Sequence, residues 1–370
     1  MGLQDKNLGL FMTRGMSLEK WAKLGTLARE IKPYNELAKD FKTIYIFSYG
    51  RRDSTLFAKD LASNLKVLPR PRHISVFLYS LLLPFIQKKT LKNIDILKTN
   101  QMDGSWAAVL AKKMYKKHLV VRCGYEWLYT IQKNKKSFLK RWTAFIVEKF
   151  AYSNADKIIL TSSVSKDFVL TNFNVNSSKI EIISNYIDTE LFRPMNIEKD
   201  PKRILFVGRL EKDKNPKNLI LACAGTQLRV VLIGEGSQKD YLKKLAAEKN
   251  VEVIFFGQVD QTRLPEEINK SQIFVLPSYM EGNPKSLLEA MSCGVACVGS
   301  DIEGINNLIR QGENGILSVN DPESLRHSIT KVVKDDVLCK KLGSNARLQI
   351  ENENSLQFCL NKELKLYQSL

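Results

Sequence analysis

Histidine and cysteine are scarce in this chain, and long apolar runs are absent from it. Its 370 residues include three His and six Cys, with no C-x-x-C pair. Such scattered side chains argue against a metal site, and the cysteines are typical of reduced thiols in a cytosolic protein. The longest apolar run, residues 75–86, is too short to cross a bilayer and contains Pro84. The N-terminus lacks a basic segment followed by an apolar one, so no signal peptide is expected.

Acidic residues are scarce in the first half of the chain. Residues 1–196 carry 33 Lys and Arg against 16 Asp and Glu, a net charge of +17, whereas residues 197–370 carry 24 against 23, a net charge of +1. The excess predicts an anionic partner for the first half: a membrane, a nucleic acid or an acidic substrate. No nucleic-acid-binding motif is present, and the nearly neutral half would contribute nothing to such binding, so nucleic acid is not the expected partner.

Short apolar runs alternate with helix-length segments along the whole chain, most cleanly in the second half. This alternation predicts βαβ units and buried parallel sheets. The strands expected in the second half are 203–208, 229–234, 251–257, 273–278 and 295–300. Those expected in the first half are 8–13, 43–50, 94–100, 118–124, 156–163 and 180–185.

The expected fold class is therefore α/β, with two Rossmann-like domains that face each other across a cleft. The first domain is expected to span 1–196 and the second 197–350, joined by a polar linker at 193–203. A C-terminal helix within 351–370 could cross back to the first domain. Ligands of open parallel sheets bind beyond the carboxyl ends of the strands, so the loops that follow the strands of the second domain should share one rim.

The segment SYMEGNPKSLLEAMSCG, 278–294, carries two glutamates of interest. Asn283 and Pro284 predict a helix start, with Asn as the cap and Pro at the first helical position. The N-terminus of this helix would offer an anion site. Glu281 would lie beside the anion, and Glu289 could accept hydrogen bonds from a vicinal diol such as a ribose. Alternatively, Glu281 belongs to a polar loop and Glu289 faces solvent.

A second motif, GRLEKDKNPKN at 208–218, also follows a strand. Arg209 and Lys214 could reach the same rim and bind phosphate oxygens, Arg as a fork and Lys as a point charge. The alternative is a solvated basic loop. The Gly-rich turn GEGSQ, which begins at Gly234, is weak evidence by itself, since such turns are frequent before helices.

Taken in order, these motifs resemble the retaining glycosyltransferases of family 4, which have the two-Rossmann architecture called GT-B. The resemblance is strong over residues 200–335 and weaker over 1–196. It implies that Arg209 and Lys214 hold the diphosphate of a nucleotide-sugar donor, of UDP or GDP type, that Glu281 contacts the donor sugar, and that Glu289 binds the ribose. The positions implied around the donor are Gly234, Gly257, Gln258, Val259, Gly282, Asn283, Pro284, Lys285, Ser286 and Glu289.

The implied reaction needs no metal and no cofactor. A glycosyl diphosphate leaves with two negative charges, which positioned cations and amide N–H groups can stabilise. No Asp or Glu is placed by the motifs as the nucleophile of a double displacement. The resemblance instead implies attack on the front face of the sugar, with retention at the anomeric carbon.

The chain departs from the family pattern at three places. Asn283 stands where many members carry an aromatic residue, and Asn306 stands with Asn307 where a Glu is common. The segment VVRCGYEW, 120–127, lacks the His that many members have in the first domain. These departures bear on the donor sugar and on the catalytic contacts of the first domain, and not on the fold.

The first domain is expected to hold the acceptor. The expected acceptor-side positions are Gly15, Met16, Arg122, Tyr125 and Glu126. Aromatic and basic residues alternate in 126–146, which suits an anionic bilayer interface, although an exposed basic helix explains that segment equally well. With the charge asymmetry, the expectation is a peripheral protein on the cytoplasmic face of the membrane with a lipid-linked glycan as acceptor.

The expected activity is retaining sugar transfer in cell-surface glycan or polysaccharide biosynthesis. Two alternatives stay open at this point. A non-catalytic nucleotide-sugar-binding protein would keep the donor site without turnover. Another two-Rossmann enzyme, such as a sugar-nucleotide epimerase or a phosphorylase, would share the architecture.

Overall fold

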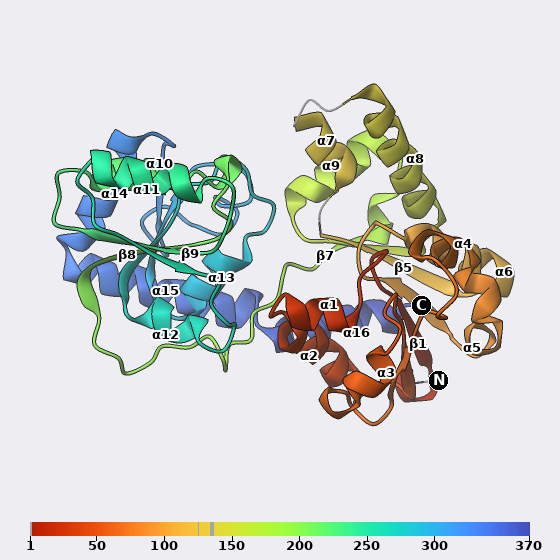
Figure 1. Cartoon of the computed structure of the whole chain (residues 1–370). Coiled ribbons are helices and arrows are strands. Elements are labelled where there is room, and N and C mark those ends of the chain that lie inside the picture. The colour runs from red at the N-terminus through yellow and green to blue at the C-terminus, as the bar shows by residue number, and fades with distance from the viewer. Residues whose placement is uncertain (1, 125, 134–136) are drawn as a thin grey trace. The chain divides into compact units, whose positions relative to one another are not determined.

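The computed structural model describes residues 2–124, 126–133 and 137–370. The chain divides into two compact units, labelled by element in Figure 1. Unit 1 comprises Met1–Ser184 and Leu360–Leu370, and unit 2 comprises Asn185–Cys359. In each unit a parallel sheet carries helices on both faces, which is why its central strands are almost wholly apolar.

Unit 1 is built on a seven-stranded sheet in the order β3-β2-β1-β4-β5-β6-β7. Its strands are β1 Asn7–Phe11, β2 Thr43–Phe47, β3 Leu65–Leu68, β4 Ile96–Thr99, β5 His118–Cys123, β6 Lys157–Leu160 and β7 Ile180–Ile182. Its helices are α1 Leu18–Lys23, α2 Leu27–Leu37, α3 Asp53–Leu56, α4 Val76–Ile86, α5 Lys88–Lys92, α6 Ser105–Tyr115, α7 Trp127–Lys133, α8 Phe138–Asn154 and α9 Ser163–Phe173. Short 3-10 turns are η1 Leu3–Asp5, η2 Ala58–Asp60 and η3 Ser177–Lys179.

Unit 2 has a six-stranded sheet in the order β10-β9-β8-β11-β12-β13. Its strands are β8 Asp200–Val207, β9 Arg229–Ile233, β10 Val253–Gly257, β11 Ser271–Leu276, β12 Ala296–Ser300 and β13 Ile316–Ser318. Its helices are η4 Lys212–Lys214, α10 Pro216–Cys223, α11 Lys239–Glu248, α12 Leu264–Asn269, α13 Lys285–Ser292, α14 Pro322–Val333 and α15 Asp336–Glu353. Every residue of β11 and β12 is buried.

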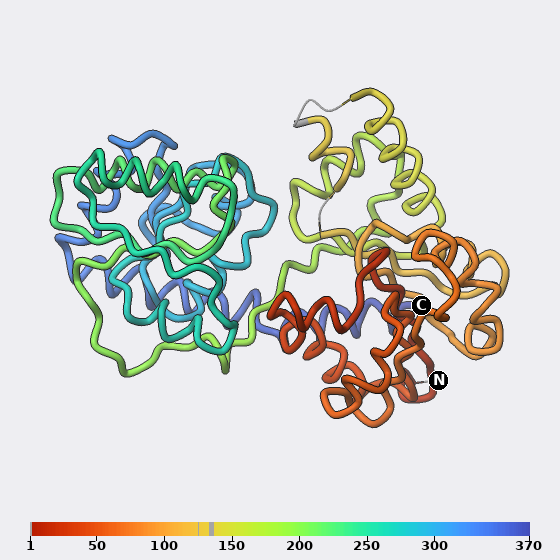
Figure 2. Tube along the Cα trace, in the orientation of Figure 1, coloured from red at the N-terminus to blue at the C-terminus, as the bar shows by residue number. Residues whose placement is uncertain are grey.

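The last helix, α16 Leu356–Gln368, begins in unit 2 and belongs to unit 1 from Leu360 onward. Figure 2 follows the trace to the C-terminus within unit 1. Two contacts hold this end of the chain: Lys98 of β4 forms a buried ion pair with Glu363, and the rings of Phe41 and Tyr367 meet edge to face at 5.5 Å. Burial lowers the pKa of Lys98, and Glu363 opposes that effect.

The α/β class with two Rossmann-like sheets is confirmed, while two short edge strands were not predicted. β3 has four residues and β13 has three, and neither contains an apolar run long enough to mark a strand in the sequence. The boundary predicted after residue 196 differs from the one after Ser184, because the intervening segment packs on unit 2. There, Ser292 Oγ donates to the carbonyl of Phe192 at 2.6 Å, and the Phe192 side chain is buried in the core.

Among the described residues, no helix combines the length and apolar character needed to cross a bilayer. All six cysteines are free and buried.

Candidate active site

Three glycines bring the loops after β8, β9 and β10 into contact. Gly234 has φ +139°, and a Cβ there would lie 1.9 Å from the carbonyl oxygen of Gly208. A Cβ on Gly236 would lie 2.3 Å from the Leu210 carbonyl oxygen. Gly257 has φ +72°, and its carbonyl accepts the N–H of Gly234 at 2.8 Å. Only glycine allows these approaches, so the three loops form one edge of unit 2.

Lys214 and Glu281 form an ion pair at that edge. Lys214 Nζ lies 2.7 Å from Glu281 Oε1, and Ser278 Oγ donates to the same oxygen at 2.8 Å. The side chains of Lys214 and Glu281 are only 17% and 9% exposed. Lys214 ends η4 after β8, whereas Ser278 and Glu281 follow β11, so neighbouring strands of the sheet deliver both partners.

Arg209 lies in a more open position than Lys214. Its side chain is 68% exposed and its Nη2 lies 3.2 Å from Asp213 Oδ2. Asp213 also lies 3.9 Å from Lys214 Nζ, and its carbonyl accepts the N–H of Tyr279 at 2.8 Å. An exposed ion pair contributes little to stability, so Arg209 can leave Asp213 for an anion at small cost.

Glu289 lies in the middle of α13 and is buried. Gln261 Nε2 donates to its Oε1 at 2.8 Å. Gln261 belongs to the loop after β10, where Gln258 is exposed and Val259 packs against the core. The alternative that Glu289 faces solvent is therefore wrong, and its carboxylate lies beside the loop that was predicted to lie around the donor.

The predicted cap of α13 is also wrong. Pro284 occupies the N-cap position, and no side chain caps the helix. Asn283 Oδ1 instead accepts the N–H of Asn185 at 3.1 Å, because the segment that enters unit 2 needs a partner there. The first turn of α13, with Lys285 and Ser286 half-buried, thus begins without a side-chain acceptor for its N–H groups, which suits a bound anion.

Residues that sequence reasoning missed hold the predicted ones in place. They are Asp213, Gln261, Ser278, Gly304 and Asn320. A Cβ on Gly304 would lie 2.4 Å from the Glu281 carbonyl oxygen and 2.6 Å from that of Gly282, so the loop after β12 packs on the glutamate loop. Gly304, in the segment EGINN at 303–307, could have been recognised from the sequence as a turn residue. Gln261 and Asn320 are ordinary loop residues, and nothing in the sequence indicates their role.

The predicted acceptor-side residues are distributed over two parts of unit 1. Gly15 has φ +75° in the loop after β1, and the carbonyl of Met16 accepts the N–H of Tyr49 at 3.1 Å. Arg122 lies in β5, where its backbone N–H donates to Thr99 Oγ1 at 3.0 Å. Glu126 follows the same strand and is buried. Tyr125 lies outside the described residues.

Two carboxyl groups are buried together near the start of α7. Glu148 accepts the N–H of Trp127 at 2.6 Å and that of Leu128 at 3.4 Å. Burial raises its pKa to about 8, and the nearby Glu126 contributes to the same shift. Burial also raises the pKa of Glu126, whose Oε1 has no hydrogen-bond partner in the described part of the chain. The two groups resist simultaneous ionisation.

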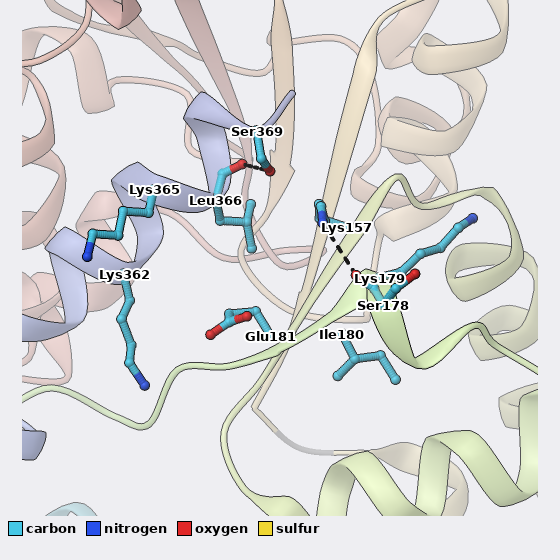
Figure 3. A pocket seen from close by; sticks show the side chains of 9 residues that line it. All are labelled: Lys157, Ser178, Lys179, Ile180, Glu181, Lys362, Lys365, Leu366 and Ser369. Atoms are coloured by element: carbon cyan, nitrogen blue, oxygen red, sulfur yellow. Dashed lines mark hydrogen bonds between the residues drawn. The ribbon is translucent and has the colours of Figure 1, made fainter.

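A pocket of about 290 Å³ lies in unit 1 at the end of the sheet where β6 and β7 begin (Figure 3). It is bordered by α16 and by four lysines: Lys157, Lys179, Lys362 and Lys365. Two of them donate to backbone carbonyls, Lys157 to Ser178 at 3.3 Å and Lys179 to Ala155 at 3.0 Å. Within the described residues, no group of three or more His, Cys, Asp or Glu is placed to hold a metal ion.

Comparison with known proteins agrees with this architecture. Residues 188–349 match the family described as "Glycosyl transferases group 1", and residues 35–191 match "Glycosyltransferase Family 4". An uncharacterized glycosyltransferase of Methanocaldococcus jannaschii is 31% identical over 254 residues, and the match covers 64% of each protein, so the chain spans under two thirds of that relative.

A second relative is matched over most of its length. The UDP-Gal:alpha-D-GlcNAc-diphosphoundecaprenol alpha-1,3-galactosyltransferase of Escherichia coli is 25% identical over 332 residues, which are 84% of this chain and 82% of that protein. Among solved structures, HepE of Anabaena in complex with UDP superposes with a TM-score of 0.77 at 18% identity, over 99% of this chain and 100% of that one. Two family matches that together run from residue 35 to 349, on a two-Rossmann fold, establish that the chain belongs to the glycosyltransferases of family 4.

Proposed function

We propose that this protein transfers a sugar from a UDP-type donor to a hydroxyl of a lipid-linked glycan, with retention at the anomeric carbon. The observation that carries the proposal is the Lys214–Glu281 ion pair, which puts a cation and a carboxylate in contact at the rim of unit 2. A nucleotide-sugar donor needs a cation at its diphosphate and an acceptor for its sugar hydroxyls, a short distance apart.

Lys214 can serve the diphosphate without releasing Glu281. An ammonium group has three N–H donors, and the contact with Glu281 uses one of them. Arg209 adds a second cation, since its surface pair with Asp213 exchanges easily for a phosphate oxygen. The uncapped first turn of α13 supplies backbone N–H groups to the same anion.

Glu281 and Glu289 have separate tasks in this proposal. Both described hydrogen bonds to Glu281 end on Oε1, so Oε2 can accept from a hydroxyl of the donor sugar. Glu289, held by Gln261 beside the loop after β10, accepts from the ribose diol. Gly257, Gln258 and Val259 then border the base.

In the reaction, the bond between the anomeric carbon and the diphosphate oxygen breaks, and a bond to the acceptor oxygen forms on the same face. The acceptor proton passes to the departing phosphate oxygen. Lys214, Arg209 and the α13 amides stabilise the charge that develops on the leaving group, which is often the largest catalytic contribution. We propose that the reaction needs no metal, so that EDTA leaves the rate unchanged.

The acceptor is proposed from the chemistry of unit 1 and from the relatives. Unit 1 is strongly basic, and the Escherichia coli relative is named for an acceptor on diphosphoundecaprenol. A polyprenyl diphosphate linked to a sugar carries two anionic phosphates at a membrane surface, which suits a peripheral basic unit on the cytoplasmic face. Gly15, Met16, Arg122 and Glu126 are the proposed contacts on this side.

The test is a transfer assay with UDP-sugars and a polyprenyl-diphosphate-linked sugar, with product stereochemistry read by NMR. Lys214→Ala should lower kcat by about 30- to 1,000-fold, equivalent to roughly 2–4 kcal/mol of transition-state stabilisation. Lys217→Ala, an exposed lysine three residues away, is the matched control and should keep wild-type activity. Wild-type kcat in Lys214→Ala, or UDP-sugar binding without turnover in the wild type, would refute the proposal.

A further inference from the structure

Helix α4 exposes one apolar face. Phe77 is 61% exposed and Phe85 59%, and the exposed set on this helix is Val76, Phe77, Leu78, Leu81, Leu82, Phe85 and Ile86. These positions recur at four-residue spacing, so they form a stripe along one side of the helix. The opposite side, with Tyr79 and Leu83, is buried against the rest of unit 1.

The first half of α8 also exposes apolar side chains. Phe138 is 80% exposed and Trp142 54%, and Leu139 and Ile146 are exposed on the same helix. Helix α6 packs against both α4 and α8 and exposes Met114 at its end. The α4–α8 face is defined here as these exposed apolar residues of α4, α6 and α8. Such patches are uncommon on soluble monomers and mark interaction sites.

The charge around the α4–α8 face is predominantly positive, and the one ion pair described on its helices is that of Asp156 with Lys112 of α6. No Asp or Glu occurs in residues 61–94 or 104–125, and residues 127–155 contain only Glu148, which is buried. Exposed cations border all three helices: Arg72, Lys88, Lys89, Lys113, Lys116, Lys140 and Arg141. A second copy of the same face would repel this one, whereas an anionic surface would attract it. The combination of apolar and cationic residues fits a bilayer with anionic headgroups.

We propose that the α4–α8 face is a membrane-docking surface, in which α4 and the start of α8 insert apolar side chains at the interface of an anionic bilayer. The flanking Lys and Arg then lie at the headgroups. This proposal deepens the proposed function, since it places unit 1 at the surface where a lipid-linked acceptor resides. It identifies α4 as the main apolar anchor, in addition to the basic segment 126–146.

The test is flotation with vesicles of phosphatidylcholine alone or with about one third phosphatidylglycerol, at low and high salt. The wild type should bind the anionic vesicles, and a bound fraction should persist at high salt, because apolar insertion is not screened. The double variant Phe77→Ser, Phe85→Ser should lower the partition coefficient at high salt about tenfold or more. Val337→Ser with Leu348→Ser removes two exposed apolar side chains from α15 of unit 2 and should bind like the wild type.

Two further measurements separate this proposal from its rivals. Urea unfolding of the Phe77→Ser, Phe85→Ser variant, followed by tryptophan fluorescence, should match that of the wild type, which shows that unit 1 is folded because all four tryptophans lie in it. Equal flotation of wild type and variant would overturn the inference. It would also be overturned if the wild type sediments as a dimer, the variant sediments as a monomer, and neither binds vesicles. Sugar transfer can fail with vesicle binding intact, and then only the proposed function is refuted.

Discussion

The two units share an architecture and differ in their surfaces. Both are parallel sheets covered by helices, yet unit 1 holds 34 Lys and Arg against 15 Asp and Glu, a net charge of +19, while unit 2 holds 23 against 24, a net charge of −1. In unit 2 the cations and anions nearly balance in number, and Lys214 pairs with Glu281. In unit 1, residues 61–94 and 104–125 contain no Asp or Glu. We propose that the same architecture holds a small charged ligand in unit 2 and docks on an extended anionic surface in unit 1.

The largest effect should come from the ion pair that joins α16 to unit 1. Glu363→Ala leaves Lys98 buried without its partner and should destabilise unit 1 by about 3–5 kcal/mol. All four tryptophans lie in unit 1, so urea unfolding followed by tryptophan fluorescence reports on this unit alone.

The matched control replaces both charges. Lys98→Met with Glu363→Leu keeps the volume and removes the pair, so it should unfold close to the wild type. Glu363→Ala should leave the affinity for UDP unchanged, because the UDP site lies in unit 2. If it weakens UDP binding by as much free energy as it lowers the stability of unit 1, the two units do not differ in the way proposed here.

An intermediate effect should separate the two glutamates of unit 2. Glu289→Gln should weaken binding of free UDP by about 1–3 kcal/mol, because a hydrogen bond to a charged group is lost beside the ribose. Glu281→Gln should leave UDP affinity near the wild-type value and lower kcat. Calorimetry with UDP and a turnover assay test the pair, and the reverse pattern would exchange the assigned roles.

An effect that depends on pH should come from Glu148 of unit 1. Its pKa in the folded protein is about 8, above the ordinary 4.5, so the folded state holds a proton that the unfolded state releases. Stability should therefore fall progressively as the pH rises from about 5 to 8. Glu148→Gln should show a shallower decline than the wild type, whereas Glu248→Gln, exposed on α11, should follow the wild type. A decline of equal slope in Glu148→Gln would contradict the assignment.

Sequence reasoning worked where a residue's role follows from its place after an apolar strand. Lys214 and Glu281 were predicted to share a rim, and they meet because parallel strands β8 and β11 end at the same edge. It failed where the role depends on a tertiary partner. Asn283 was predicted to cap a helix, but its side chain accepts a hydrogen bond from the backbone of Asn185. Gln261 donates a hydrogen bond to Glu289 from a loop whose sequence shows no recognisable motif. The strands β3 and β13 are short edges, stabilised by one neighbour each rather than by their own composition.

The return of α16 also has a consequence for biosynthesis. Unit 2 is one continuous stretch of chain inserted between the two parts of unit 1. On the ribosome, unit 1 therefore starts to form first and is completed last, after every residue of unit 2 has emerged. Until then Lys98 lacks Glu363, and the nascent protein carries an unfinished basic unit. A chain that ends early at Cys359 would release an intact unit 2 attached to an incomplete unit 1, which favours degradation of truncated products over their survival.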